Sequence, residues 1–225
     1  MAIKPIVRFS RKIFASVSSA GNAITQDFAS AMTSTTASST SYSHAQGSLV
    51  NGYVVVGVAW RGSNTISSLT YGGTAMTLLA SYSYNTSNSS IYGLALGTSS
   101  GSQTVAITFS ASTSFDIGSV TFSNVHQAGG FSTVSYHNAF TNNIGSGTIA
   151  TTSTNQVVIS IAEGDPQTGG TITPQGNVNT YWSESTLLIA AFGWAQGAVG
   201  NTPMVWGTTS INYCTAAIVV LTPAP

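Results

Sequence analysis

Residues 53–60, with the sequence YVVVGVAW, decide the fold class of this chain. The run is apolar almost without interruption, and its valines are β-branched residues that fit a pleated sheet better than a helix. A short, continuous apolar run of this kind predicts a central strand that is buried on both faces.

Short β-type runs with turn signals between them continue on both sides of this strand. Residues 66–71 and 74–82 flank Gly72-Gly73, which is a strong signal for a two-residue hairpin. Further apolar runs follow at intervals of about ten residues, at 90–96, 103–109, 117–122, 131–140, 157–162, 187–194, 204–207 and 216–221. This pattern predicts an all-β fold, an antiparallel β-sandwich of the jelly-roll or Ig-like type. No internal repeat with a fixed period is visible in the sequence.

Charge is divided very unevenly along the chain. Four of the five basic residues lie in the first twelve positions (Lys4, Arg8, Arg11 and Lys12), and the fifth is Arg61. Residues 1–35 therefore carry a net charge of +3, from four basic residues and Asp27, and residues 36–225 carry −3, from one basic and four acidic residues. This layout predicts a cationic arm that attaches to a partner and a nearly uncharged body that packs against neighbouring molecules or is displayed on them.

The arm has two predicted parts. Apolar and polar residues alternate over residues 6–13 behind Pro5, which predicts an edge strand. Asn22 is expected to cap a short helix that carries Ile24, Phe28 and Met32 at steps of four. The Ser/Thr-rich residues 33–43 are interpreted as a linker. The sequence thus predicts an arm with its linker at residues 1–39 and a β-sandwich domain at residues 40–225.

Composition narrows the class of protein. Charged residues make up 4% of the chain, against about 25% in an average soluble domain. Surfaces rich in Ser, Thr and Asn pack together without desolvating charge, which suits adhesins, filaments and virus particles. Cys214 is the single cysteine, so no internal disulfide or thiolate cluster forms, and a buried structural thiol is expected. No run of eighteen apolar residues indicates a membrane span.

The stretch after Lys12 is interrupted by Ser16, Ser18, Ser19 and Asn22, which is unsuitable for the hydrophobic part of a secretion signal. We therefore expect the arm to belong to the mature protein and the chain to be made in a cytoplasm.

Several segments, in order, resemble a β-sandwich module that recurs in uncharacterised structural proteins of bacteriophages and in bacterial cell-surface proteins. They are TYGGTAMTLL, IYGLALGTSSGSQTVAITFSAS, GSVTFSNVHQA, NQVVISIA and the closing AAIVVLTPAP. The resemblance covers roughly residues 40–225, and its best marker is Thr70-Tyr71-Gly72-Gly73 followed by Met76-Thr77. It implies a sandwich fold and carries no catalytic residues to transfer.

Candidate catalytic and metal-binding residues do not form a recognisable pattern. The histidines His44, His126 and His137 lack a Gly-x-Ser-x-Gly nucleophile string as partner. Glu163 and Asp165 are expected in a turn, where a calcium ion is an open alternative without a supporting motif. We therefore expect a protein without enzymatic activity, cofactor or assigned metal site.

Two kinds of binding residue remain as hypotheses. Tyr82, Tyr84, Tyr92 and Trp182 lie near Asn-rich loops and are candidates for stacking on sugar rings, or else they fill the core or an interface. The arm is expected to bind a protein partner by strand addition rather than nucleic acid, through Ile6, Val7, Arg8, Phe9, Arg11, Lys12 and Ile13.

Together these expectations predict a non-enzymatic structural protein of a virus particle, which would be a capsid, decoration, tail or fibre component of a phage. Its partners would be other virion proteins or copies of itself, with a host-surface glycan as a further candidate and no membrane contact. The alternatives are an extracellular adhesin or carbohydrate-binding module, and a small jelly-roll capsid protein with a genome-binding arm.

Overall fold

The described part of the chain is built from β-strands, and no helix occurs within it. The computed structural model describes residues 22–30, 33–128, 131–139, 143–176, 178–184 and 188–225. The strands are β1 (Thr25–Ala29), β2 (Thr33–His44), β3 (Leu49–Arg61), β4 (Ile66–Tyr71), β5 (Thr74–Ala75), β6 (Thr77–Tyr84), β7 (Ser87–Ser99), β8 (Gln103–Ser123), β9 (Ser132–Ala139), β10 (Asn143–Thr151), β11 (Val157–Gln175), β12 (Asn179–Glu184), β13 (Ile189–Gln196) and β14 (Gly200–Leu221).

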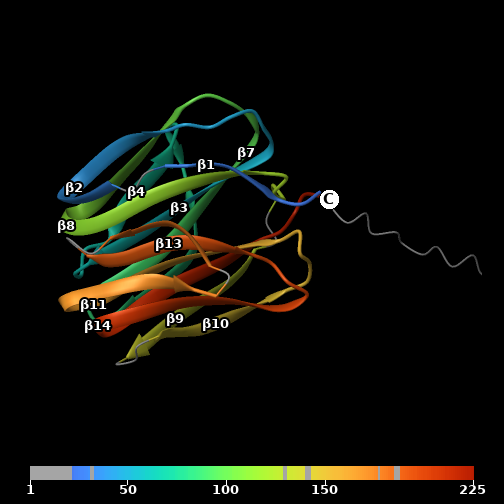
Figure 1. Cartoon of the computed structure of the whole chain (residues 1–225). Helices are drawn as coiled ribbons and strands as arrows, with labels where there is room; N and C mark the ends of the chain where they lie inside the picture. Colours follow the sequence, from blue (N-terminus) through green and yellow to red (C-terminus); the bar gives the residue numbers. More distant parts are fainter. Residues whose placement is uncertain (1–21, 31–32, 129–130, 140–142, 177, 185–187) are drawn as a thin grey trace, which may run out of the picture.

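The strands form two stacked antiparallel sheets (Figure 1). The first has the order β5-β4-β8-β3-β7-β6, with β1 and β2 also paired to β8. The second has the order β10-β14-β11-β13-β12, with β9 also paired to β14. The prediction of an all-β antiparallel sandwich is therefore confirmed.

Three apolar clusters fill the molecule. One lies between the two sheets and joins residues of β3, β7 and β8 to residues of β11, β13 and β14. A second lies inside the first sheet, where Leu69 and Tyr71 of β4 pack with the valines of β3 and with Leu94 of β7. Since β4 and β7 are not neighbours in the sheet, this sheet must curl to bring them together. The third covers the other face of the second sheet and includes Cys214, which is buried as expected.

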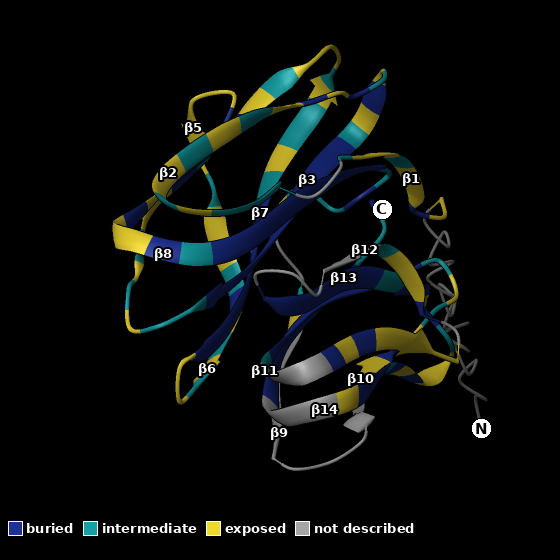
Figure 2. Ribbon diagram, turned by 60° about the vertical axis from the view of Figure 1, so that its left-hand side comes forward, coloured by how far each residue is buried: buried dark blue, intermediate teal, exposed yellow. Residues whose placement is uncertain are grey.

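The predicted central strand lies where the apolar clusters meet. Residues 54–59 of β3 are fully buried, with alternate side chains in the two clusters on either side of the sheet (Figure 2). At Gly57 the sheets approach so closely that a Cβ atom would lie 2.7 Å from Cδ2 of Phe192. The glycine in YVVVGVAW therefore sets the spacing between the two sheets.

The two halves of the chain repeat one topology, although the sequence shows no repeat of fixed period. In each half the last strand is the longest, with 21 residues in β8 and 22 in β14. In the first half, β8 pairs along one edge with β1 and β2 and along the other with β3 and β4. In the second half, β14 pairs along one edge with β9 and β10 and along the other with β11. The strands β7 and β6 then extend the first sheet as β13 and β12 extend the second.

The hairpin at Gly72-Gly73 is confirmed, but its second strand is shorter than predicted. Both glycines have positive φ, +55° and +78°, as a tight turn between paired strands requires. The chain pairs with β4 over Thr74–Ala75, and the N–H of Met76 still donates to the carbonyl of Leu69. After Met76 the chain leaves β4, because β6 pairs instead with β7 at the opposite end of the strand order.

Two predictions for the segment before the body are wrong. The residues expected to form a helix after Asn22 form β1, which pairs with β8 and exposes 48% of Phe28. The residues expected as a linker form β2, a polar strand of 12 residues paired to β8. Each error has the same cause, since backbone pairing with a distant strand overrides the local pattern. The predicted boundary at residue 40 falls inside β2, and the arm residues 6–13 lie outside the described residues.

Candidate functional site

The aromatic residues predicted to bind sugar do not form one platform. Tyr82 and Tyr84 follow Ala80 on β6 at steps of two, on the face that is turned toward the second sheet. Tyr92 lies on the opposite face, where it packs against the cluster inside the first sheet and burial raises the pKa of its hydroxyl. The backbone of Trp182 belongs to β12 of the second sheet, and its side chain lies outside the described part. Tyr92 therefore does not share one flat stacking surface with Tyr82 and Tyr84.

Three of the five charged residues of the body meet at one place between the sheets. Arg61, at the end of β3, donates from Nη2 to Oε1 of Glu163 at 3.0 Å and lies 2.8 Å from Oδ1 of Asp165 through Nη1. The same Nη2 donates to the carbonyl oxygen of Gly164 at 2.8 Å. The two acidic residues were expected in a turn, but they lie in β11. One guanidinium thus joins the first sheet to the second.

The electrostatics of this cluster fit a structural clamp. The Glu163 side chain has no exposed surface, and burial raises its pKa to about 8, while Arg61 acts in the opposite direction. The guanidinium contacts one oxygen of each carboxylate, whereas Oε2 of Glu163 is buried without a hydrogen-bond partner. Within the described ranges, no group of three or more His, Cys, Asp or Glu side chains gathers into a metal-binding arrangement. Sequence reasoning missed the role of Arg61, although it is the single basic residue beyond the arm.

A second polar network lies beneath β1. The Nδ1 atom of His44 is 2.8 Å from the Ser119 hydroxyl, and its Nε2 is 3.3 Å from the hydroxyl of Thr121. Thr121 in turn donates to Oδ2 of Asp27 at 3.1 Å, and the Ser30 hydroxyl lies 3.0 Å from that of Ser119. The network therefore attaches β1, which carries Asp27, to the two strands β2 and β8.

The Ser119 hydroxyl is hydrogen-bonded to the His44 imidazole, as a catalytic serine is to its base. A substrate, however, cannot reach this pair. His44 has no exposed surface and Ser119 has 1%. Burial lowers the pKa of His44 to about 4, so the imidazole is neutral over most of the pH range. A catalytic serine must reach a substrate carbonyl, whereas Ser119 lies under Ser30. We interpret the network as an attachment for β1. No sequence motif predicts it.

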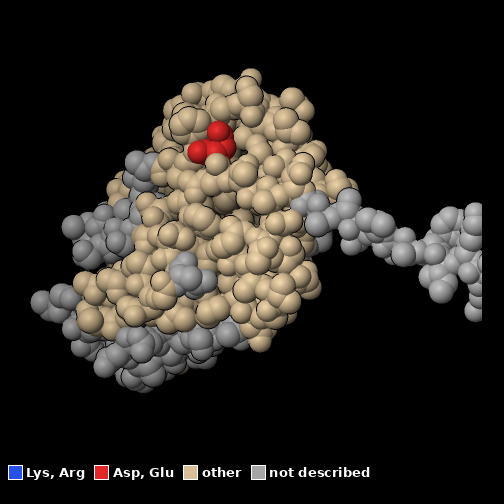
Figure 3. All heavy atoms as spheres, turned by 45° about the vertical axis from the view of Figure 1, so that its right-hand side comes forward, with Lys and Arg blue, Asp and Glu red and all other residues tan. Residues whose placement is uncertain are grey.

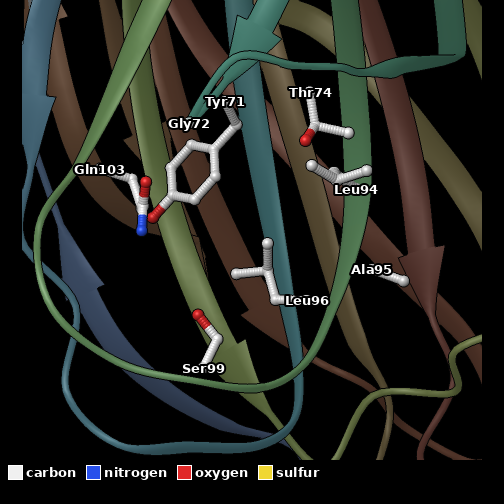
Figure 4. A pocket seen from close by; sticks show the side chains of 8 residues that line it. All are labelled: Tyr71, Gly72, Thr74, Leu94, Ala95, Leu96, Ser99 and Gln103. Atoms are coloured by element: carbon white, nitrogen blue, oxygen red, sulfur yellow. The ribbon is translucent and has the colours of Figure 1, made fainter.

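The first sheet is open at one end, where a pocket of about 280 Å³ lies within the curl. Its lining comes from the Tyr71-Gly72 hairpin with Thr74, from Leu94, Ala95, Leu96 and Ser99 of β7, and from Gln103 at the start of β8 (Figure 4). The hairpin and β7 are far apart in the strand order, so the curl of the sheet creates the pocket. The sequence marked the hairpin as a turn and gave no sign of a cavity beside it.

A larger hollow of about 390 Å³ lies on the other side of β7, between Tyr53, Leu79 and Phe131. Phe131 directly follows residues 129–130, which are outside the described part, so the wall of this hollow is incomplete. The pocket at the mouth of the curl is open to solvent, but its lining consists of described residues that are not interrupted by an undescribed segment, so it is the better defined of the two.

Comparisons with family models, with curated proteins and with solved structures return no match. In the described residues, no helix has the length and apolar character that crossing a membrane requires. The resemblance noted in the sequence therefore stays a prediction, and function has to be argued from the geometry of the chain.

Proposed function

We propose that this chain is a non-enzymatic structural subunit of a virus particle, of a phage, and that its N-terminal arm attaches it to a neighbouring subunit. The observation that carries the proposal is the distribution of charge after folding. The one cation of the body, Arg61, is engaged with Glu163 and Asp165. The other four basic residues all lie at positions 4–12, ahead of β1.

The surface of the body supports close packing against neighbours. Figure 3 shows a face on which the described residues include no Lys or Arg and a single small acidic patch. A surface of hydroxyl and amide groups can be buried in an assembly without the desolvation cost of charge. A surface that steers a charged ligand would instead concentrate charge of one sign around a cleft.

The strand β2 supports assembly through sheet edges. It pairs with β8 along one edge, and in the described part of the chain no strand pairs with its other edge. Its sequence, TSTTASSTSYSH, contains no Lys, Glu or Pro, the residues with which soluble proteins protect exposed edges. An unprotected edge of 12 residues is suited to strand addition by a neighbouring chain.

The first test is association of the purified full-length chain with itself and with the products of genes beside its own. A capsid, portal or tail gene in that position would support the virion setting. Val7→Asp with Phe9→Asp should weaken association at least tenfold, because burial of each apolar side chain contributes about 1.5–3 kcal/mol before ordering costs. The double variant should keep the unfolding temperature of the wild type.

A matched pair, Arg11→Ala with Lys12→Ala, should weaken association mainly at low salt, because exposed charges act through screened fields. Unchanged association of the Val7→Asp/Phe9→Asp variant would refute the arm as the anchor. Tight binding of single-stranded DNA, with a log–log salt slope of about −3 from four neutralised phosphates, would favour the genome-binding alternative instead.

The second candidate function, an extracellular binding module, is favoured by the pocket at the mouth of the first sheet. Ligands commonly bind in the mouths of β-barrels and similar curled sheets.

A screen of the full-length chain against esters, peptides and polysaccharides should show no hydrolysis. Turnover that Glu163→Gln or Asp165→Asn abolishes would overturn the non-enzymatic assignment.

A further inference from the structure

The most distinctive motif of the sequence lies at the pocket in the mouth of the first sheet. Tyr71 and Gly72 belong to the hairpin that marks the chain, and both line the cavity. At Gly72 a Cβ atom would lie 2.5 Å from Oε1 of Gln103, so any side chain there would displace the glutamine amide. The glycine therefore serves the pocket as well as the turn, because it lets the amide of Gln103 lie against the hairpin.

The lining is divided into a polar side and an apolar side. The hydroxyl end of Tyr71 and the amide of Gln103 lie on one side, and Leu94 and Leu96 lie on the other (Figure 4). The hydroxyl of Ser99 adds a further polar group to the lining. A ligand that fills this cavity needs hydrogen-bonding groups along one edge and an apolar face.

The polar side is held in place by bonds behind the cavity. Tyr71 donates from its hydroxyl to Oε1 of Gln46, and Nε2 of Gln46 donates to the hydroxyl of Ser99. With these bonds made, the Tyr71 oxygen can still accept a hydrogen bond and the Ser99 hydroxyl can still donate one. Two groups of opposite hydrogen-bonding character are thus oriented before any ligand arrives, which reduces the entropy cost of binding.

Charge in and around the pocket disfavours ionic ligands. No Lys, Arg, Asp, Glu or His lines the cavity. Burial raises the pKa of Tyr71 and the charge of Asp27 raises it further, so the phenol is neutral. An ion of either sign would lose its hydration without gaining an oppositely charged partner among the described lining residues.

We propose that this pocket binds one ring of a neutral sugar. The apolar face of a pyranose would pack on Leu94 and Leu96, and its hydroxyl groups would bond to Ser99 and Gln103. Tyr71, which is 2% exposed, would hold Ser99 in place through Gln46. The volume of about 280 Å³ is below the usual range of drug-sized sites and suits a single ring at the end of a glycan or a free monosaccharide. This site differs from the tyrosines and the tryptophan that sequence analysis selected, and it does not depend on the structural role of the arm.

The experiment titrates the full-length chain with the methyl glycosides of glucose, galactose, mannose and N-acetylglucosamine, and with an oligosaccharide that ends in the best of these. Binding is followed by protein-observed NMR of backbone amide and leucine methyl groups. Binding of at least one glycoside is expected in about the millimolar range, which is usual for a ligand of this size. The shifts should concentrate on Leu94, Leu96 and the hairpin. A gain for the oligosaccharide would identify a glycan end as the source, and equal binding would identify the free sugar.

Two variants and a control assign the site. Gln103→Ala and Ser99→Ala should each weaken binding at least fivefold, and Thr98→Ala, an exposed neighbour on β7, should leave it unchanged. Unaltered amide spectra away from the pocket show that each variant is folded, and a variant that fails this check is replaced by the other. The proposal is overturned if none of the four glycosides binds at a concentration of 50 millimolar, roughly ten times the largest dissociation constant expected for such ligands. It is also overturned if only sialylated or sulfated sugars bind, or if the shifts map elsewhere.

Discussion

Removal of the Arg61 guanidinium should destabilise the protein by an amount that grows with pH. In Arg61→Ala, the carboxyl group of Glu163 keeps its fully buried position and loses the cation 3.0 Å away. The carbonyl of Gly164 also loses its donor, and Asp165, which is 22% exposed, loses a partner that water can partly replace.

The magnitude depends on whether Glu163 is ionised. Its pKa is raised to about 8, so near pH 5 the carboxyl is neutral in the folded wild type. The variant then loses chiefly the bond to Gly164 and the partly buried ion pair with Asp165, together about 2 kcal/mol. At pH 9 the wild type holds a buried ion pair, and its disruption should cost about 3–5 kcal/mol, because an uncompensated charge is left in the interior.

Urea unfolding at pH 5 and pH 9, followed by the fluorescence of the buried Trp60 and Trp206, measures both costs. Asp165→Asn is the matched control and should lose less than about 1 kcal/mol at either pH, since exposed pairs contribute little. Adding Glu163→Gln to Arg61→Ala should recover most of the extra loss at pH 9. A cost for Arg61→Ala that is equal at both pH values, or smaller at pH 9, would refute the assignment of Glu163 as a buried acid clamped between the sheets.

Three further expectations concern stability. His44 has a pKa of about 4 when folded, against about 6.5 when unfolded. As pH falls, the unfolded chain therefore takes up a proton before the folded one does. The free energy of unfolding should fall by up to about 3 kcal/mol between pH 6.5 and pH 4. The unfolding free energies of wild type and His44→Gln, measured over this range, check the contribution, and parallel pH profiles of the two would contradict it. Gly57→Ala should cost about 1–3 kcal/mol in urea unfolding, because the new methyl group would lie 2.7 Å from the Phe192 ring; Gly73→Ala, which meets no atom within 4 Å, tests the separate cost of a positive φ. Deletion of residues 1–21 should leave a cooperative thermal transition. Deletion of residues 1–35 should lower its midpoint by several degrees, because it removes β1, Ser30 and the first three residues of β2 and uncovers His44. Equal midpoints for the two deletions would show that these residues contribute nothing to stability.

The candidate site was only partly accessible to sequence reasoning. The hairpin at Tyr71-Gly72 was found from its turn chemistry, but the pocket beside it was not. Its other wall, Leu94 and Leu96, belongs to a strand that reaches the hairpin only when the sheet curls. The tyrosines were chosen because they lie near an Asn-rich loop, but Tyr92 is on the opposite face of the sheet from Tyr82 and Tyr84. Side chains of a strand alternate between two faces, and closeness to a loop does not record the face.

The sequence by itself determined the features that depend on local chemistry. The apolar run around Val56 was sufficient to predict a buried central strand, and Gly72-Gly73 was sufficient to predict a tight turn, since positive φ is a property of single residues. The tertiary structure alone decided which strands pair. A period of two specifies a strand but not its neighbour, so the polar residues of β2 were interpreted as a linker although they form an edge strand on β8. For the same reason the ion pair between Arg61 and Glu163, which lie 102 residues apart, became visible only when the two sheets were stacked.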